Sequence, residues 1–172
     1  MKPMDRLLAL SAAGLLCLGS IGCGPGDASG GPLAFELFVD QATPTPIASW
    51  QVALMSQGSR SDCAQLQTSC LHGQVTKDRL VRLTDSKGAE HPAIAFPASA
   101  PSGGTQDVGI TAAVGTDYKL IIEALSADAT PQLLGTSCTP LPEGIRSGTN
   151  KAVLAEPLKL FSPPLTCDPR WE

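Results

Sequence analysis

The sequence predicts an all-β protein, an antiparallel sandwich of roughly seven or eight short strands in a single domain that covers residues 33–172. Two observations lead to this class. Short segments alternate apolar with polar residues, which is the two-residue period of a half-buried strand. Turn-forming residues, chiefly Gly, Pro, Asp and Ser, separate these segments at short intervals. Beyond residue 22, no stretch sustains the apolar spacing of an amphipathic helix.

The first half of the domain contains four of the expected strands, at residues 33–40, 50–55, 79–84 and 93–96. In the first strand, Leu33, Phe35, Leu37 and Val39 share one face. In the second, residues 50, 52 and 54 form one face and residues 51, 53 and 55 the other. Such alternation predicts strands with one buried and one solvated face.

The second half repeats the pattern, with strands expected at residues 108–114, 118–124, 132–138 and 151–160. Residues 85–88 predict a turn and residues 98–106 a surface loop, while residues 63–70 have room for one helical turn. The side chains expected to contribute most to the core are Phe35, Leu37, Trp50, Val52, Ile110, Tyr118, Leu120 and Ile122.

Residues 115–124, Gly-Thr-Asp-Tyr-Lys-Leu-Ile-Ile-Glu-Ala, resemble the Gly-Thr-x-Tyr-x-Val-x-Val-x-Ala strand of fibronectin type III domains, and similar strands occur in prealbumin-like sandwiches. The resemblance covers ten residues and implies an Ig-like or prealbumin-like fold. It implies that the Tyr118 hydroxyl bonds to upstream backbone at the corner between two sheets. Trp50 would match the tryptophan of an early strand. The alternative is that Tyr118 and Trp50 are ordinary core residues of a β protein.

The first 22 residues have the layout of an export signal. Lys2 and Arg6 precede an apolar run at residues 7–21, and small residues surround its end. Residues 20–23, Ser-Ile-Gly-Cys, resemble the lipobox of bacterial lipoproteins. The resemblance implies cleavage before Cys23, acylation of its thiol, and sorting to the outer membrane by Gly24. The alternatives are an ordinary secretory signal, or a membrane-spanning helix, for which 15 residues fall short of the required ~20.

Residues 23–32 would then comprise the lipidated cysteine and a flexible tether, because nearly all of them after Cys23 are turn formers. Removal of residues 1–22 takes away two of the 12 basic and one of the 16 acidic residues, which leaves 10 and 15 and a net charge of −5. This mildly acidic chain has no basic cluster, so nucleic acid is excluded as an expected partner. Attachment to the membrane is expected through the acyl chains.

Four cysteines lie beyond the anchor: Cys63, Cys70, Cys138 and Cys167. An even number in an exported chain of this size predicts two disulfides. The local pair Cys63–Cys70 together with Cys138–Cys167 is the favoured connectivity. The runner-up joins Cys70 to Cys138 and Cys63 to Cys167.

No residue pattern predicts a catalytic, metal or cofactor site. Cys63, Cys70 and His72 are too few for a structural zinc site, and the expected disulfides consume both thiols. A Cys/His nucleophile pair with His72 or His91 meets the same objection. The acidic residues expected on exposed faces or turns are Glu36, Asp40, Glu90 and Glu123.

We therefore expect a lipid-anchored cell-envelope protein that binds or scaffolds, without catalytic activity, in the outer membrane. Its partner would be another envelope protein, meeting an open sheet edge or the loop at residues 98–106. One alternative is a lipoprotein that binds a carbohydrate or a small ligand. The other is an envelope enzyme of unrecognised type, centred on His72 or His91.

Overall fold

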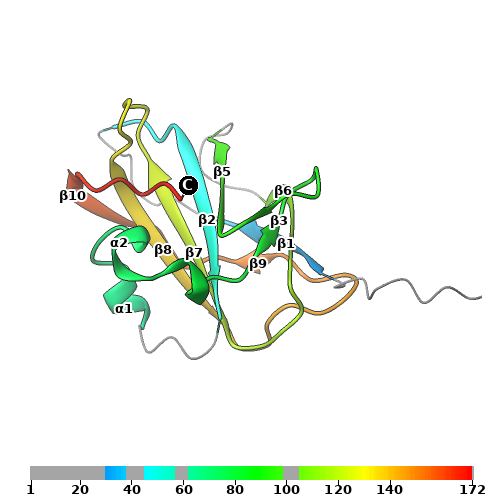
Figure 1. Cartoon of the computed structure of the whole chain (residues 1–172). Coiled ribbons are helices and arrows are strands. Elements are labelled where there is room, and N and C mark those ends of the chain that lie inside the picture. The colour runs from blue at the N-terminus through cyan, green and yellow to red at the C-terminus, as the bar shows by residue number, and fades with distance from the viewer. Residues whose placement is uncertain (1–29, 38–44, 57–61, 99–104, 172) are drawn as a thin grey trace, which may run out of the picture.

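The computed structural model describes residues 30–37, 45–56, 62–98 and 105–171, and for residues 105–108 the backbone alone. These residues form two sheets of five strands each, so the predicted all-β sandwich is confirmed (Figure 1). The predicted signal segment, Cys23 and the tether up to residue 29 lie outside the described residues. So do Val39, Asp40 and most of the predicted loop at residues 98–106. No helix in the described ranges has the length and apolarity to cross a bilayer.

One sheet, called sheet A, is built mainly on the antiparallel pair β1 and β6. In the order in which they lie across the sheet, its strands are β4 (Glu90–His91), β3 (Leu83–Thr84), β6 (Thr105–Ala112), β1 (Gly31–Glu36) and β9 (Val153–Leu154). All neighbours are antiparallel except β1 and β9, which are parallel. Both edges of sheet A are therefore strands of only two residues, which limits the backbone they expose for pairing.

The other sheet, sheet B, is antiparallel throughout. Its strands lie in the order β10 (Lys159–Leu165), β8 (Leu133–Leu141), β7 (Tyr118–Leu125), β2 (Ser49–Met55) and β5 (Ala93–Pro97). Proline lacks the backbone N–H that a central strand must donate, and Pro163 and Pro164 indeed lie in the edge strand β10.

The main core lies between the two sheets. Phe35, Leu83 and Ile110 of sheet A pack in one cluster with Leu120 and Ile122 of sheet B. The predicted core residues for which burial is described are all buried, namely Phe35, Leu37, Trp50, Val52, Ile110, Tyr118, Leu120 and Ile122. The predicted division of β1, β2 and β7 into two faces is thus confirmed, whereas the face of β2 and β7 that was expected to be solvated is buried as well.

Tyr118 closes the connection between the sheets. Its hydroxyl donates to the backbone carbonyl of Ala113, 3.2 Å away, just beyond the end of β6. Tyr118 itself begins β7, so the bond spans the passage from sheet A to sheet B in the way expected of a tyrosine corner. Gly115 lies beneath the ring, and a Cβ there would collide with the Tyr118 hydroxyl.

The strand count differs from the prediction, since the described residues form ten strands. Residues 151–160 do not form one strand: β9 joins sheet A and β10 joins sheet B, with Pro157 between them. Only residues 83–84 of the segment 79–84 form a strand, because the chain first crosses β2, where the Val81 N–H donates to the Leu54 carbonyl at 2.7 Å. The predicted turn at residues 85–88 is present, with the Gly88 N–H donating to the Asp85 carbonyl.

Candidate functional site

The outer face of sheet B is covered by non-strand chain. Residues 62–80 contain the short helices α1 (Cys63–Leu66), α2 (Leu71–Gln74) and η1 (Lys77–Arg79), and residues 166–171 form a tail after β10. We call these two segments the cover. Apolar side chains of the cover, such as Leu66 and Leu71, pack with Met55 and Ile121 of the sheet in a second core. The three central strands of sheet B, β2, β7 and β8, are therefore buried on both faces.

A buried carboxylate lies where the cover meets the sheet. Glu123 of β7 is 1% exposed, and Gln51 lies directly opposite it on β2. The Gln51 amide Nε2 donates to Glu123 Oε2 at 2.8 Å and to the backbone carbonyl of Pro169 in the tail at 2.6 Å. The backbone N–H of Leu71 in α2 donates to Glu123 Oε1 at 2.9 Å. One carboxylate thus links two strands, a helix and, through Gln51, the tail.

Burial raises the pKa of Glu123 from its ordinary 4.5 to about 7, because an apolar surrounding disfavours the charged form. The hydrogen bonds from the Leu71 N–H and the Gln51 amide favour the charged form and limit this rise. Both protonation states of Glu123 are consequently populated near neutral pH.

Two disulfides fasten the cover. Cys63 of α1 joins Cys138 of β8, with 5.5 Å between the Cα atoms. Cys70, directly before α2, joins Cys167 of the tail, with 6.1 Å between the Cα atoms. The expectation that these four cysteines form two bridges is confirmed.

Both connectivities weighed from the sequence are wrong. The pair Cys63–Cys70 fails because α1 directs the two thiols into different clusters: Cys63 packs with Cys138 in the core beneath the helices, and Cys70 packs with Cys167 beside Leu125 and Leu133. The runner-up, Cys70–Cys138 and Cys63–Cys167, fails for the same reason. Proximity along the chain was misleading because the helical turn between the cysteines separates them in space.

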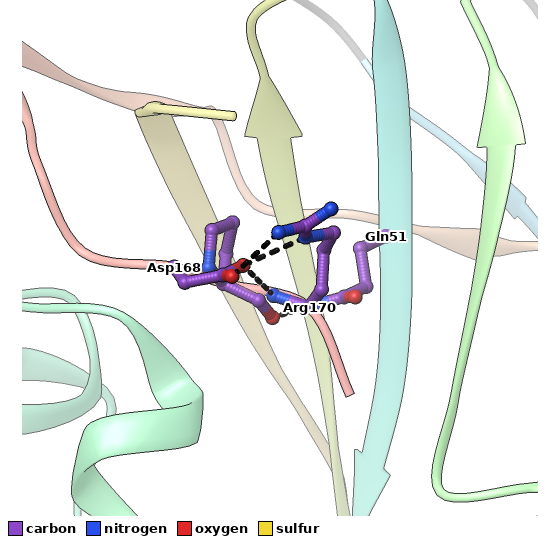
Figure 2. A network of polar contacts seen from close by, with 4 residues as sticks. Gln51, Asp168 and Arg170 are labelled. Atoms are coloured by element: carbon purple, nitrogen blue, oxygen red, sulfur yellow. Dashed lines mark hydrogen bonds and ion pairs between the residues drawn. The ribbon is translucent and has the colours of Figure 1, made fainter. Parts of the chain in front are cut away.

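The tail contains an ion pair of its own and packs against the sheet and α2 through Trp171. Figure 2 shows Gln51 beside the Asp168–Arg170 pair, in which the guanidinium Nη2 lies 2.7 Å from Asp168 Oδ2. The side-chain hydrogen bonds from Arg170 lower the pKa of Asp168 to about 2. Trp171 packs in the second core, and its indole Nε1 is buried without a hydrogen-bond partner in the described part of the chain.

The two histidines lie on different elements, and their side-chain contacts are with Trp171 and Asp85. His72 is exposed on α2, with its ring against the edge of Trp171 at a centroid distance of 4.8 Å. His91 on β4 has Nε2 3.2 Å from Asp85 Oδ2, and 42% of its side chain is exposed. Asp85 also accepts from the backbone N–H groups of Lys87 and Ala89, and the bond from Ala89 is the largest cause of its lowered pKa. Each histidine therefore occupies the surface.

The candidate metal ligands Cys63, Cys70 and His72 do not converge, because each thiol is consumed in a different disulfide. Within the ranges that the structure describes, no group of three or more His, Cys, Asp or Glu residues is arranged to hold a metal ion.

Among the acidic residues, Glu90 is exposed, as expected, and Glu36 is half-buried. The expected exposure of Glu123 is wrong, because the cover lies over its side of β7. A signal for this was present in the sequence: β2 carries Ala53 and Met55 on the same face as Gln51, and β7 carries Ile121 beside Glu123. Apolar residues on both faces of two paired strands are typical of a sheet buried on both sides.

A surface hollow of about 360 Å³ lies on the other side of the molecule, at the β9 edge of sheet A. The loop of residues 143–151 forms one wall and the start of β1 another. Pro32, Leu33, Ile145 and Val153 supply its apolar lining, and its charged lining is Glu143, Arg146 and Lys151. None of the site residues expected from the sequence lines this hollow.

Asn150 fixes the shape of this loop. Its side-chain Oδ1 accepts from the Arg146 N–H at 3.0 Å, and its Nδ2 donates to the Arg146 carbonyl at 2.8 Å. A Cβ at Gly31 would collide with the same carbonyl, so β1 and the loop are in close contact. The hollow is thus bounded by backbone that its own hydrogen bonds hold in place.

The predicted structural residues Trp50 and Tyr118 both belong to the main core and are each 8% exposed. Neither lies at Glu123 or at the hollow. No protein-family model matches the chain, and neither the curated proteins nor the solved structures contain a match to it.

Proposed function

We propose that this protein is a lipid-anchored module of the bacterial cell envelope that binds or scaffolds another envelope protein. The observation that carries the proposal is the pair of disulfides in the cover: Cys63–Cys138 fastens the cover to sheet B, and Cys70–Cys167 joins its two segments. Bridges of this kind persist in oxidising compartments, which agrees with the export signal expected at residues 1–22. Cys23 at the end of that signal is the expected attachment point for acyl chains.

The form of the domain suits a binding module. The central strands of sheet B are buried on both faces and two disulfides restrain the cover, so we expect the outer surface of the cover to be held rigidly on the sheet. A rigid surface loses less conformational entropy on binding than a flexible one. The acyl chains would keep this surface next to the membrane, where its partner also resides.

The test is a comparison of two cysteine variants in the producing cell. Cys23→Ser should abolish incorporation of labelled palmitate and release the protein from the membrane fraction. Cys17→Ser is the matched control, because residue 17 lies within the expected signal. This substitution should leave palmitate incorporation and membrane retention unchanged. Membrane retention and labelling of Cys23→Ser would refute the anchor. Cross-linking of the wild-type protein in intact cells, followed by mass spectrometry, tests for an envelope partner.

A second candidate function is the binding of a small ligand, and the hollow beside β1 is the observation that favours it. Its volume of about 360 Å³ lies at the lower end of the range typical of ligand sites, roughly 300–1,000 Å³.

A further inference from the structure

We propose that the hollow between β1 and residues 143–151 binds a phospholipid headgroup that carries both a phosphate and a primary amine. The proposal rests on the lipid anchor put forward above, since the anchor determines what the hollow meets. Three observations support it: the charges of the lining, the apolar residues beside them, and the place of the hollow along the chain.

The charged lining matches a zwitterion. Arg146 and Lys151 present two cationic groups, and Glu143 presents one carboxylate. Arginine binds phosphate through paired N–H donors, and lysine adds a point charge. The carboxylate of Glu143 offers an acceptor for an ammonium group. A ligand with a phosphate and an amine therefore complements all three side chains at once.

The existing ion pair does not prevent this. Arg146 Nη2 lies 3.3 Å from Glu143 Oε2, and both side chains are more than 70% exposed. Such a pair is worth no more than about 1 kcal/mol, so the guanidinium can turn to a phosphate at little cost. Lys151 forms no ion pair with any residue in the described ranges, which leaves its ammonium available.

The apolar lining fits the part of a lipid next to its headgroup. Pro32 of β1 and Val153 of β9 adjoin the charged groups and are exposed or half-buried, whereas Leu33 and Ile145 are 3% exposed and belong to the main core. A free phosphate ion would leave Pro32 and Val153 without a counterpart. A glycerol backbone and the first carbons of its acyl chains would cover them.

The position of the hollow brings it to the membrane. Pro32 and Leu33 lie at the start of the domain, and seven residues separate Cys23 from Gly31. Even when fully extended, a chain of that length spans no more than about 30 Å. Figure 1 shows the start of β1 beside the loop that precedes β9. An anchor at Cys23 therefore holds this end of the sandwich close to the headgroups.

Net charge favours the zwitterionic class of lipid. The chain after Cys23 is acidic overall, so an anionic surface would repel it, while a headgroup without net charge would not. The hollow would act as an orienting contact, since a single headgroup adds little to the affinity of the acyl chains.

The first experiment uses soluble probes and the purified protein, which can be taken from either the membrane fraction or the soluble fraction. Titration with glycerophosphoethanolamine should shift the amide NMR signals of Leu33 and of residues 145–151 in a saturable manner. The variant Arg146→Gln/Lys151→Gln should bind about tenfold more weakly, a loss of about 1.4 kcal/mol. Arg82→Gln/Lys87→Gln is the matched control, because both residues are exposed near the opposite, β4 edge of sheet A. Equal affinity of the two double variants would overturn the proposal.

The amine and the lipid are tested separately. Glu143→Gln should weaken binding of glycerophosphoethanolamine but not of inorganic phosphate, and equal binding of both probes to the wild type would refute the part played by the amine. In vesicles that contain phosphatidylethanolamine, amide exchange in residues 145–151 should be slower than in phosphatidylcholine vesicles. Binding of the soluble probe without this protection would identify a soluble phosphoester, and not a lipid, as the ligand. The titrations with soluble probes do not depend on acylation, so failure of the anchor and failure of the site are distinguishable.

Discussion

Gln51 lies directly opposite Glu123 in the pairing of β2 with β7, and its amide joins the buried carboxylate to the Pro169 carbonyl of the tail. The polar pair therefore sits beneath a cover that two disulfides restrain. The stability of the cover should depend on the protonation of Glu123, on the Gln51 amide and on the disulfides.

Stability should fall as the pH rises through neutrality. The pKa of Glu123 is about 7 in the folded protein and near its ordinary 4.5 in the unfolded chain, so the folded state binds more protons between these values. The free energy of unfolding should decrease across this window, by about 3 kcal/mol in total, and level off above it. Urea unfolding between pH 5 and pH 8 measures the slope. Glu123→Gln should remove it, whereas Glu90→Gln, at an exposed position, should retain it. A flat profile in the wild-type protein would contradict the raised pKa.

Replacing Gln51 with Ala should loosen the tail. The substitution removes the bridge to Pro169 and leaves Glu123 with one fewer donor in a buried place, at a cost of about 1–3 kcal/mol. Hydrogen exchange should become faster in residues 168–171, and the unfolding midpoint should fall. Gln65→Ala, on the exposed side of α1, is the control and should stay within about 0.5 kcal/mol of the wild type. Equal effects of the two substitutions would argue against the bridge.

Peptide mapping without reduction should recover Cys63 linked to Cys138 and Cys70 linked to Cys167. Replacing both Cys70 and Cys167 with Ala should cost about 2–4 kcal/mol, mainly because the unfolded chain regains freedom. The tail should then become sensitive to proteases while the sandwich remains folded. A peptide that contains Cys63 linked to Cys70 would contradict the structure.

Tyr118→Phe should destabilise the fold by about 1 kcal/mol, because it removes the hydrogen bond to the Ala113 carbonyl and leaves the ring in place. Chemical denaturation measures the change. The free energy of unfolding of Phe161→Leu, a substitution at a half-buried position outside this corner, serves as the comparison. No loss of stability in Tyr118→Phe would mean that the hydroxyl does not contribute to closing the connection between the sheets.

Local patterns in the sequence were sufficient to predict the sandwich. Alternation identified β1, β2 and β7, and the ten-residue resemblance placed Tyr118 at a corner, because these features depend on neighbours along the strand. Residues 151–160 were harder to predict, because this one apolar segment is divided between β9 and the start of β10, which join different sheets.

The cover and the hollow depend on contacts between distant parts of the chain. Glu123 looks like a solvated residue of a half-buried strand until the helices and the tail are placed over it. The charged residues of the hollow, Glu143, Arg146 and Lys151, belong to a loop without periodicity. Only the fold brings that loop beside residues 32 and 33.

The order of the disulfides along the chain constrains how the protein matures. Of the four bridged cysteines, the first in the sequence pairs with the third and the second pairs with the fourth, so the two disulfide loops overlap along the chain. If the chain is exported as proposed, an oxidase that joined cysteines as they emerged from the export channel would link Cys63 to Cys70 and trap the chain in a wrong pairing. Cys167 follows β10, so the Cys70–Cys167 bridge can form only after all five strands of sheet B have left the ribosome. On the proposed export route, the native pairing therefore requires either delayed oxidation or a disulfide isomerase, and cells that lack the isomerase should accumulate the mispaired form.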